Sequence, residues 1–233
     1  MLPIGDDNSG RRITPVVTYA LIALNVLFFL VEMNGGDAFI ERWAFVPRRF
    51  LADPAGDLAT IFTAMFMHAG WLHLIGNMLY LWIFGDNVED RMGSVRFAVF
   101  YLICGSIAGL TQLLTNPDST LPSVGASGAI AGVLGAYLIF FPTARLIVLF
   151  PIFFFPFFFE VPAVLYLVLW YFIQLFSGAA ALADPQQVGG IAWWAHVGGF
   201  VSGMLLCRLF VRRRRQSQPD EYGLEWAWEP RSR

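Results

Sequence analysis

The chain has 233 residues, of which 57% are apolar and only 14% are charged. Soluble domains carry about 25% charged residues, so this composition excludes an ordinary soluble globule. The high apolar content excludes a disordered chain, and two cysteines are too few for a disulfide scaffold. All 15 basic residues are arginines and the formal net charge is −2, which gives no overall attraction to nucleic acid. We therefore expect an integral membrane protein that contacts the lipid bilayer and binds no nucleic acid.

Six apolar segments are candidates for membrane-spanning helices. About 20 apolar residues in a helix cross the ~30 Å hydrocarbon core. In chain order, the predicted spans are residues 13–33, 71–85, 97–114, 127–141, 161–176 and 195–211. Prolines interrupt the first half of the long apolar region 146–176, and proline breaks a helix. We therefore expect one span in this region, preceded by an apolar loop that lies in the membrane interface.

The arginines predict the orientation of the chain. Arg11 and Arg12 precede the first span and four arginines follow the last, so the positive-inside rule places both termini in the cytoplasm. With six spans, 12 arginines lie inside and only Arg42, Arg48 and Arg49 lie outside. The expected organisation is a cytoplasmic segment at 1–12, a six-helix domain at 13–211, and a basic, then polar cytoplasmic tail at 212–233. The first outer loop, 34–70, is long and partly apolar, so we expect it to be partly embedded in the membrane surface.

Four polar residues gather at one membrane face on this map. Polar side chains at membrane depth are costly and by default mark a functional site. His73 and Asn77 lie in the outer third of the second span, whereas Ser127 opens the fourth span and His196 opens the sixth. Further polar residues are interpreted as structural hydrogen-bonding groups or, in the case of the histidine, as a loop anchor: Asn25, Gln112, Gln174 and His68.

Small residues on the fourth and sixth spans predict a close helix contact. They are Gly125, Gly128, Ala131 and Gly135 around the fourth span, and Gly199 and Gly203 on the sixth. Small residues at such spacings let two backbones approach closely in lipid. If the two stripes face one another, Ser127 and His196 meet at the same end of the contact, as a nucleophile and its base would. His73 and Asn77 are one helical turn apart and can both donate hydrogen bonds to a developing oxyanion.

Other chemistries find less support in the sequence. The chain has no His-Glu-x-x-His motif for a zinc protease, and neither Asp57 nor Asp86 lies inside a predicted span. The sequence predicts no cofactor and no metal site. Cys104 and Cys207 sit within apolar runs and are interpreted as packing residues. A solute transporter would contain inverted repeats or broken helices, and we find no internal repeat.

Three motifs resemble those of the rhomboid family of intramembrane serine proteases. They are Gly125-Ala-Ser127-Gly, His73-Leu-Ile-Gly-Asn77, and His196 followed by Gly199 and Gly203. The similarity extends over about residues 14–211. It implies an all-α membrane protein, a bundle of six transmembrane helices with a long, partly membrane-embedded first outer loop. Six spans without an additional first helix or a transit peptide lead us to expect a prokaryotic plasma membrane.

The resemblance also implies roles for the polar residues. Ser127 would be the nucleophile and His196 the general base, while His73, Asn77 and the Ser127 backbone amide would form the oxyanion hole. The substrates would be transmembrane proteins, cleaved near the outer face and commonly beside a small residue. The alternative is a non-catalytic rhomboid-like protein that binds membrane clients; such proteins lack the serine or the histidine, and both are present here. The oligomeric state is left open.

Two positions depart from the family pattern. Ala59-Thr60 stand in the first outer loop where many members have Trp-Arg, which leaves open how the loop is anchored. Ala131 stands one turn after Ser127, where some members have an aromatic residue that stacks on the base. His196 is therefore expected to be held in another way.

Overall fold

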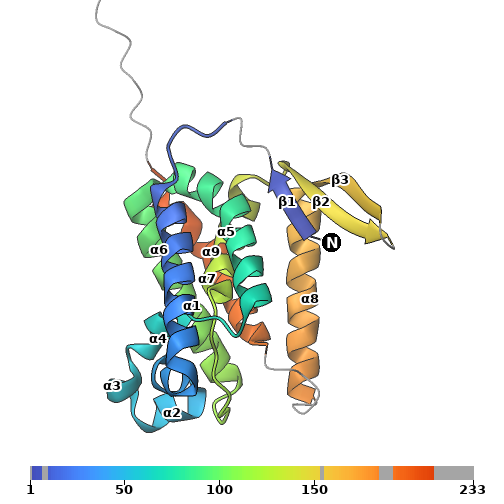
Figure 1. The fold of residues 1–233 in the computed structure, drawn as a ribbon. Coiled ribbons are helices and arrows are strands. Elements are labelled where there is room, and N and C mark those ends of the chain that lie inside the picture. Colours follow the sequence, from blue (N-terminus) through green and yellow to red (C-terminus); the bar gives the residue numbers. More distant parts are fainter. Residues whose placement is uncertain (1, 7–9, 153–154, 184–190, 213–233) are drawn as a thin grey trace, which may run out of the picture.

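A computed structural model describes residues 2–6, 10–152, 155–183 and 191–212 (Figure 1). Six helices form a bundle: α1 (Val16–Trp43), α5 (Trp71–Met92), α6 (Ser94–Thr115), α7 (Ser127–Phe140), α8 (Ala163–Ala183) and α9 (Trp193–Phe210). Of the tail predicted at 212–233, only Arg212 lies within the described residues.

The lengths of the helices bear on the predicted spans. Helices α1, α6 and α8 are long and apolar enough to cross a membrane. Helix α5 gives a fourth candidate when it is joined to the segment 54–66, from which it is bent by 78°. Helix α7 has 14 residues, so it is only about 21 Å long and shorter than the ~30 Å hydrocarbon core. The chain is a mostly helical integral membrane protein, and the count of six spans stays a prediction.

The segment expected as the first outer loop is largely helical. Helix α1 continues past a kink at Gly36, and the short helices α2 (Pro47–Ala52), α3 (Pro54–Asp57), α4 (Thr60–Thr63) and η1 (Ala64–Phe66) follow it. Arg49 holds these pieces together: its Nε lies 2.5 Å from Asp57 Oδ2, and its Nη2 donates to the Ala44 carbonyl at 2.6 Å. Arg49 therefore anchors the segment expected as the first outer loop, for which the absence of a Trp-Arg pair had left the anchoring open.

The segment expected as an apolar loop before the fifth span consists of two strands, so the expectation of a loop is wrong, while its place in the membrane interface stays a prediction. Strands β2 (Arg145–Ile152) and β3 (Phe155–Pro162) form an antiparallel hairpin, and β1 (Leu2–Asp6) pairs with β2 in the order β1-β2-β3. The prolines that exclude a helix are tolerated because Pro156 and Pro162 lie on the edge strand β3, and Pro151 lies on β2 beyond the residues that pair with β1. Leucine, isoleucine, valine and phenylalanine supply strand propensity. The all-α expectation therefore holds for the bundle and fails for this three-stranded sheet, which includes part of the segment 1–12.

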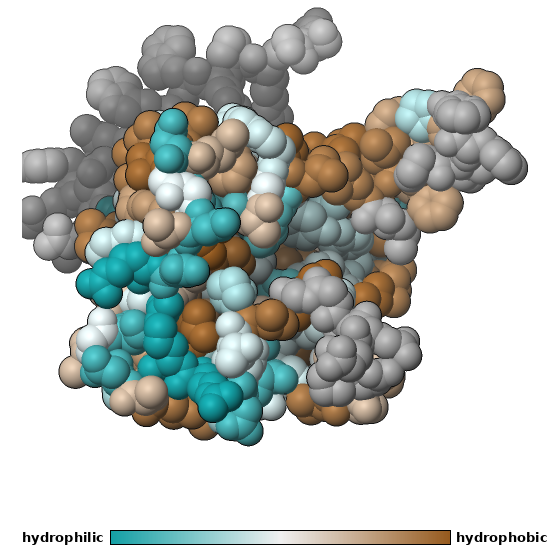
Figure 2. Space-filling model, turned by 60° about the horizontal axis from the view of Figure 1, so that its bottom comes forward, coloured by the Kyte–Doolittle hydropathy of each residue, from teal (hydrophilic) through white to brown (hydrophobic). Residues whose placement is uncertain are grey.

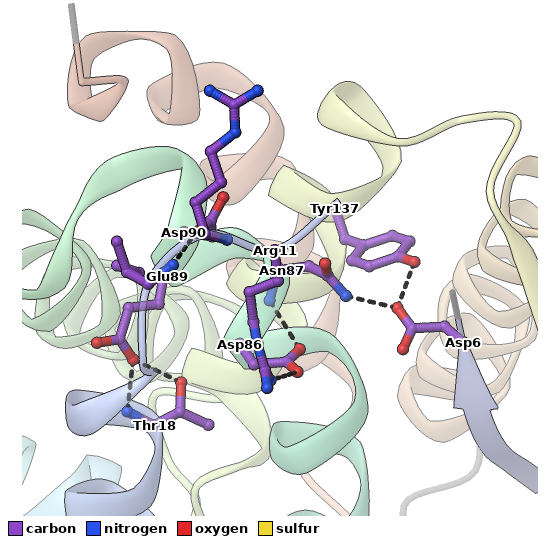
Figure 3. Close-up of polar contacts among 10 residues, drawn as sticks. Asp6, Arg11, Thr18, Asp86, Asn87, Glu89, Asp90 and Tyr137 are labelled. Atoms are coloured by element: carbon purple, nitrogen blue, oxygen red, sulfur yellow. Dashed lines mark hydrogen bonds and ion pairs between the residues drawn. The ribbon is translucent and has the colours of Figure 1, made fainter. Parts of the chain in front are cut away.

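Polar contacts tie the sheet and α1 to the bundle at the end opposite the start of α7 (Figure 3). Glu89 is fully buried and accepts hydrogen bonds from the backbone N–H and the hydroxyl of Thr18, at 2.7 and 2.8 Å. It thereby satisfies a donor at the start of α1, where helix N–H groups lack intrahelical partners. Asp6 of β1 accepts hydrogen bonds from Tyr137 and Asn87, at 2.6 and 2.7 Å.

The core of the bundle is aromatic and aliphatic. Its largest fully buried side chains include Tyr101, Tyr137, Phe84, Phe97 and Phe100. Both cysteines, Cys104 and Cys207, are buried and free, as expected for packing residues.

Candidate active site

Ser127 and His196 meet where α7 and α9 begin. Ser127 is the first residue of α7 and His196 lies in the first turn of α9. The Nε2 atom of His196 lies 2.8 Å from the Ser127 hydroxyl oxygen, within hydrogen-bond distance. Both side chains are partly exposed. A hydroxyl bonded to an imidazole nitrogen in this way can lose its proton to the ring as it attacks a carbonyl.

Glycines bring α7 and α9 together. A methyl group at Gly199 would overlap the Gly128 carbonyl oxygen, and one at Gly203 would overlap the Gly132 carbonyl oxygen. On α7, a methyl group at Gly135 would overlap the Phe200 carbonyl oxygen. The obstacles are backbone atoms, so no side-chain movement could relieve them. The α7 surface in this contact therefore includes Gly128, Ala131 and Gly135 of the expected small residues, together with Gly132.

Gln174 of α8 determines which nitrogen of His196 carries the proton. The Nδ1 atom of His196 lies 2.8 Å from Gln174 Oε1. The amide NH₂ of Gln174 donates to the Trp170 carbonyl one turn earlier, at 3.3 Å, which turns Oε1 toward the histidine. An amide oxygen only accepts, so Nδ1 must carry the proton and Nε2 must present its lone pair to Ser127. This tautomer is the one that a general base needs.

Two tryptophans occupy the space beside the imidazole ring. Trp170 of α8 lies 5.9 Å from the His196 ring, centroid to centroid, and Trp193 lies 6.2 Å away and nearly perpendicular. Ala131 offers no ring here, so the histidine is held by Gln174 and by aromatic residues of α8 and α9.

His73 has the opposite tautomer. The backbone N–H of Ala69 donates to His73 Nδ1 at 3.3 Å, so the ring proton lies on Nε2. A methyl group at Gly125 would lie 2.9 Å from this Nε2 and 3.6 Å from the Ser127 hydroxyl oxygen. Gly125 also has a φ of 129°, which L side chains rarely adopt. The glycine therefore leaves room for the N–H donor of His73 to lie beside Ser127.

Asn77 lies one turn further along α5. Its side chain is buried, and its Nδ2 has no hydrogen-bond partner among the residues that the structure describes. A buried amide donor without a partner is costly, so such a group is suited to receive an oxygen during a reaction. The start of α7 adds the Ser127 backbone N–H, because the first N–H groups of a helix have no intrahelical acceptor.

His68 supports this arrangement from the turn before α5. It is 1% exposed, and burial lowers its pKa to about 4, so it is neutral at neutral pH. It therefore adds no positive charge beside His73, whose ring centroid is 5.1 Å away. Its backbone N–H donates to Glu32 at 2.9 Å and ties the turn to α1, which agrees with its expected role as a loop anchor.

A small cavity of about 40 Å³ lies beside Ser127. Its lining is dominated by small residues, including Gly105, Ala108, Gly125, Gly128, Ala129 and Ala195. A much larger cavity, about 1260 Å³, lies at the other end of the molecule, next to the sheet and the last turn of α7. The described residues contain no group of three or more His, Cys, Asp or Glu side chains that could hold a metal.

The structure places three of the four predicted polar residues at one site, and it adds Gln174 to this site. Ser127, His196 and His73 share one site, with Asn77 on the next turn of α5. The sequence interpretation gave Gln174 a structural role only. The one feature of the sequence that pointed to Gln174 was its position in the outer half of the fifth predicted span, at the same membrane face as the other four polar residues.

Fold and site together define an integral membrane protein with a hydrogen-bonded serine–histidine pair at one end of a helix bundle. A model of the rhomboid domain matches residues 55–213, which is more than half of the chain, so the chain belongs to the rhomboid family. It is 40% identical over 126 residues to the rhomboid protease GluP of Bacillus subtilis. It is also 35% identical over 153 residues to RHOMBOID-like protein 1 of Arabidopsis thaliana, and 28% identical over 194 residues to the mitochondrial Rhomboid protein 1 of Saccharomyces cerevisiae.

These alignments cover different shares of the proteins. They include 53%, 66% and 81% of this chain, but only 24%, 34% and 51% of the respective relatives. The family domain is therefore shared, while the relatives contain long regions without a counterpart in the alignment.

The glycine contact predicts the effect of one added methyl group. We expect Gly203→Ala to destabilise the protein by about 2 kcal/mol, a usual cost of overpacking, because the Gly132 backbone cannot yield. Gly109→Ala in α6 is the control, since nothing lies within 4 Å of the added methyl, and a helical alanine gains about 1 kcal/mol over glycine. Thermal unfolding in detergent, followed by tryptophan fluorescence, measures both. Equal unfolding temperatures for the two variants would contradict the steric argument.

Proposed function

We propose that this protein is an intramembrane serine endopeptidase that cleaves transmembrane proteins through a Ser127/His196 dyad. The observation that carries the proposal is the 2.8 Å contact between His196 Nε2 and the Ser127 hydroxyl, in a chain of the rhomboid family. The relative named rhomboid protease GluP supports the same activity. The proposed organisation keeps the six spans, the domain at 13–211 and the cytoplasmic termini, in a prokaryotic plasma membrane.

The reaction proceeds in two steps. The Ser127 oxygen attacks the substrate carbonyl while its proton passes to His196 Nε2, and the carbonyl oxygen takes the negative charge. The N–H groups of His73 Nε2, Asn77 Nδ2 and the Ser127 backbone stabilise this oxyanion. When the peptide C–N bond breaks, the proton on His196 moves to the leaving amine and an acyl-enzyme remains. Water then attacks the acyl group, with His196 again as base, and releases Ser127.

The cavity beside Ser127 supports a preference for a small residue at the cleavage site. It measures only about 40 Å³ and is lined mainly by glycine and alanine, so it favours a small side chain over a bulky one. A carbonyl inside a transmembrane helix is already hydrogen-bonded, so the substrate must unwind locally before the attack. The proposal therefore includes cleavage next to a small residue in a weakly helical stretch near the outer face.

The dyad is tested by covalent labelling. We expect a fluorophosphonate probe to label the wild-type protein, and Ser127→Ala to abolish both the label and the cleavage of a model transmembrane substrate in liposomes. His196→Ala should abolish cleavage as well, because Ser127 then lacks its base. A folded wild-type protein that takes no label and cleaves no substrate would favour the non-catalytic alternative, a rhomboid-like protein that binds membrane clients.

The oxyanion donors are tested by rate rather than by binding. His73→Ala and Asn77→Ala should each lower kcat by about 10²- to 10³-fold, with KM little changed, since these donors act mainly in the transition state. Asn25→Ala serves as a matched amide control because its Nδ2 is already bonded to the Leu21 carbonyl within α1. If Asn77→Ala and Asn25→Ala had the same kcat, Asn77 would have no part in the oxyanion hole.

Gln174 acts as a positioning residue, and its acceptor oxygen is the group to test. We expect Gln174→Leu to lower kcat about tenfold, the value of one ordinary hydrogen bond, without a matching change in KM. Gln174→Glu keeps an acceptor and should retain more activity than Gln174→Leu. The matched control is Gln112→Leu in α6, since no hydrogen bond joins Gln112 to the dyad among the described residues. Equal rates for Gln174→Leu and Gln174→Glu would show that Gln174 only fills space.

A further inference from the structure

The β2–β3 hairpin carries a concentration of exposed aromatic side chains that the proposed reaction does not use. It extends sideways from the bundle, next to the start of α8 (Figure 1). The exposed aromatic residues are Phe150, Phe155, Phe157, Phe158 and Phe159. Seen from the end that carries α2 to α4, apolar residues dominate the hairpin where it projects beyond the helices (Figure 2).

The strand register sorts these side chains onto two faces. Directly opposed residues of an antiparallel pair project to the same face, and successive residues alternate between faces. Val148 pairs with Phe159, and Phe150 pairs with Phe157. We call the face that these residues share the aromatic face; it comprises Leu146, Val148, Phe150, Phe155, Phe157, Phe159 and Val161. Every member is apolar.

The opposite face of the hairpin is charged where it joins the bundle. We call it the polar face; its members include Arg145, Ile147, Glu160 and, near the tip, Phe158. Arg145 and Glu160 form an ion pair at 3.5 Å and line the cavity of about 1260 Å³. Three further arginines line the same cavity: Arg12, Arg91 and Arg212. The β2–β3 hairpin is therefore amphipathic, with its charged residues Arg145 and Glu160 on one face and its phenylalanines mainly on the other.

The aromatic face of the hairpin is turned toward the helix bundle. Leu146 and Val148 are buried in the same core as Ala163 and Leu167 of α8, so this face lies against the helices at its base. Further out, Phe150 and Phe157 have no such cover and are exposed. Helix α8 runs away from the same face, and it is one of the helices long and apolar enough to span a membrane. The uncovered part of the aromatic face is therefore turned toward the bilayer that α8 is long enough to cross.

We propose that the aromatic face of the hairpin rests in the lipid interface, in the leaflet at the end of the bundle opposite Ser127. Aromatic side chains are enriched at this level of a membrane. The depth is limited by the backbone: β3 is an edge strand, and its unpaired N–H and C=O groups cannot enter the hydrocarbon. The strands therefore lie at the headgroup level and only the side chains reach the acyl chains, while the charged pair on the polar face stays in water. This placement anchors the start of α8 at a fixed height.

Adjacent residues on the two faces give a matched pair for the test. Phe157→Cys places a thiol on the aromatic face, and Phe158→Cys places one on the polar face. Each variant is labelled with the environment-sensitive fluorophore NBD in nanodiscs of phosphatidylcholine and phosphatidylglycerol, which leave both leaflets open to added quenchers. The wild-type chain, whose two cysteines are buried, is the labelling blank.

The quenching pattern decides between lipid and water. We expect lipids with a nitroxide at acyl carbon 5 to quench the label at 157 about threefold more strongly than the label at 158, and iodide to show the reverse order. Equal iodide quenching at both positions would overturn the proposal, as would stronger quenching at 157 by a nitroxide at carbon 12 than at carbon 5. If Phe157→Cys fails to elute as folded protein in size-exclusion chromatography, Phe159→Cys on the same face replaces it, with the same criteria.

Discussion

The close approach of α7 and α9 is the constraint on which the site depends. In lipid there is little hydrophobic force to join two helices, so van der Waals contact between backbones has to do so. Gly199 and Gly203 lie against the carbonyl oxygens of Gly128 and Gly132, and no larger residue fits at either position. This contact starts at the first turn of both helices, where Ser127 and His196 are found. The hydrogen bond between their side chains is therefore a consequence of the distance between the two backbones.

The two histidines beside Ser127 are given opposite tautomers by simple local partners. The amide oxygen of Gln174 accepts a hydrogen bond from the Nδ1–H of His196, which leaves Nε2 free to accept a proton. The backbone N–H of Ala69 donates a hydrogen bond to Nδ1 of His73, so the ring proton lies on Nε2 and this nitrogen is a donor. One imidazole can thus remove a proton and the other can donate a hydrogen bond, although both rings lie within the same site. The chemistry of each ring follows from a contact on its far side, away from the serine.

Much of this arrangement could be predicted from the sequence, because polar residues in an apolar chain are few and their depth follows from their position in a span. Ser127, His73 and His196 were identified in this way. The role of Gln174 could not be, since helical spacing gives its depth in α8 but not the residue that it faces on α9. The sheet was missed for a different reason. Leu2 of β1 pairs with Leu149 of β2 across most of the chain, and no local pattern reveals such a pairing. Similarly, the prolines of β2 and β3 excluded a helix, but the sequence did not show that these prolines fit into strands.

Helix α8 differs from α7 in how it is held, and this difference bears on the base. Its buried residues are Ala163, Tyr166 and Leu167 near its start, and then only Gln174 and Gly178. Near the dyad it is joined to α9 by two hydrogen bonds, from His196 Nδ1 to Gln174 Oε1 at 2.8 Å and from Trp194 Nε1 to the Gly178 carbonyl at 3.2 Å. Trp170 and Tyr171 of α8 add ring contacts with Phe200 of α9. Hydrogen bonds of this kind are worth far less than a tightly packed interface. The position of His196 therefore rests on a close glycine contact with α7, whereas its tautomer rests on Gln174 of a helix that has few buried residues near the dyad.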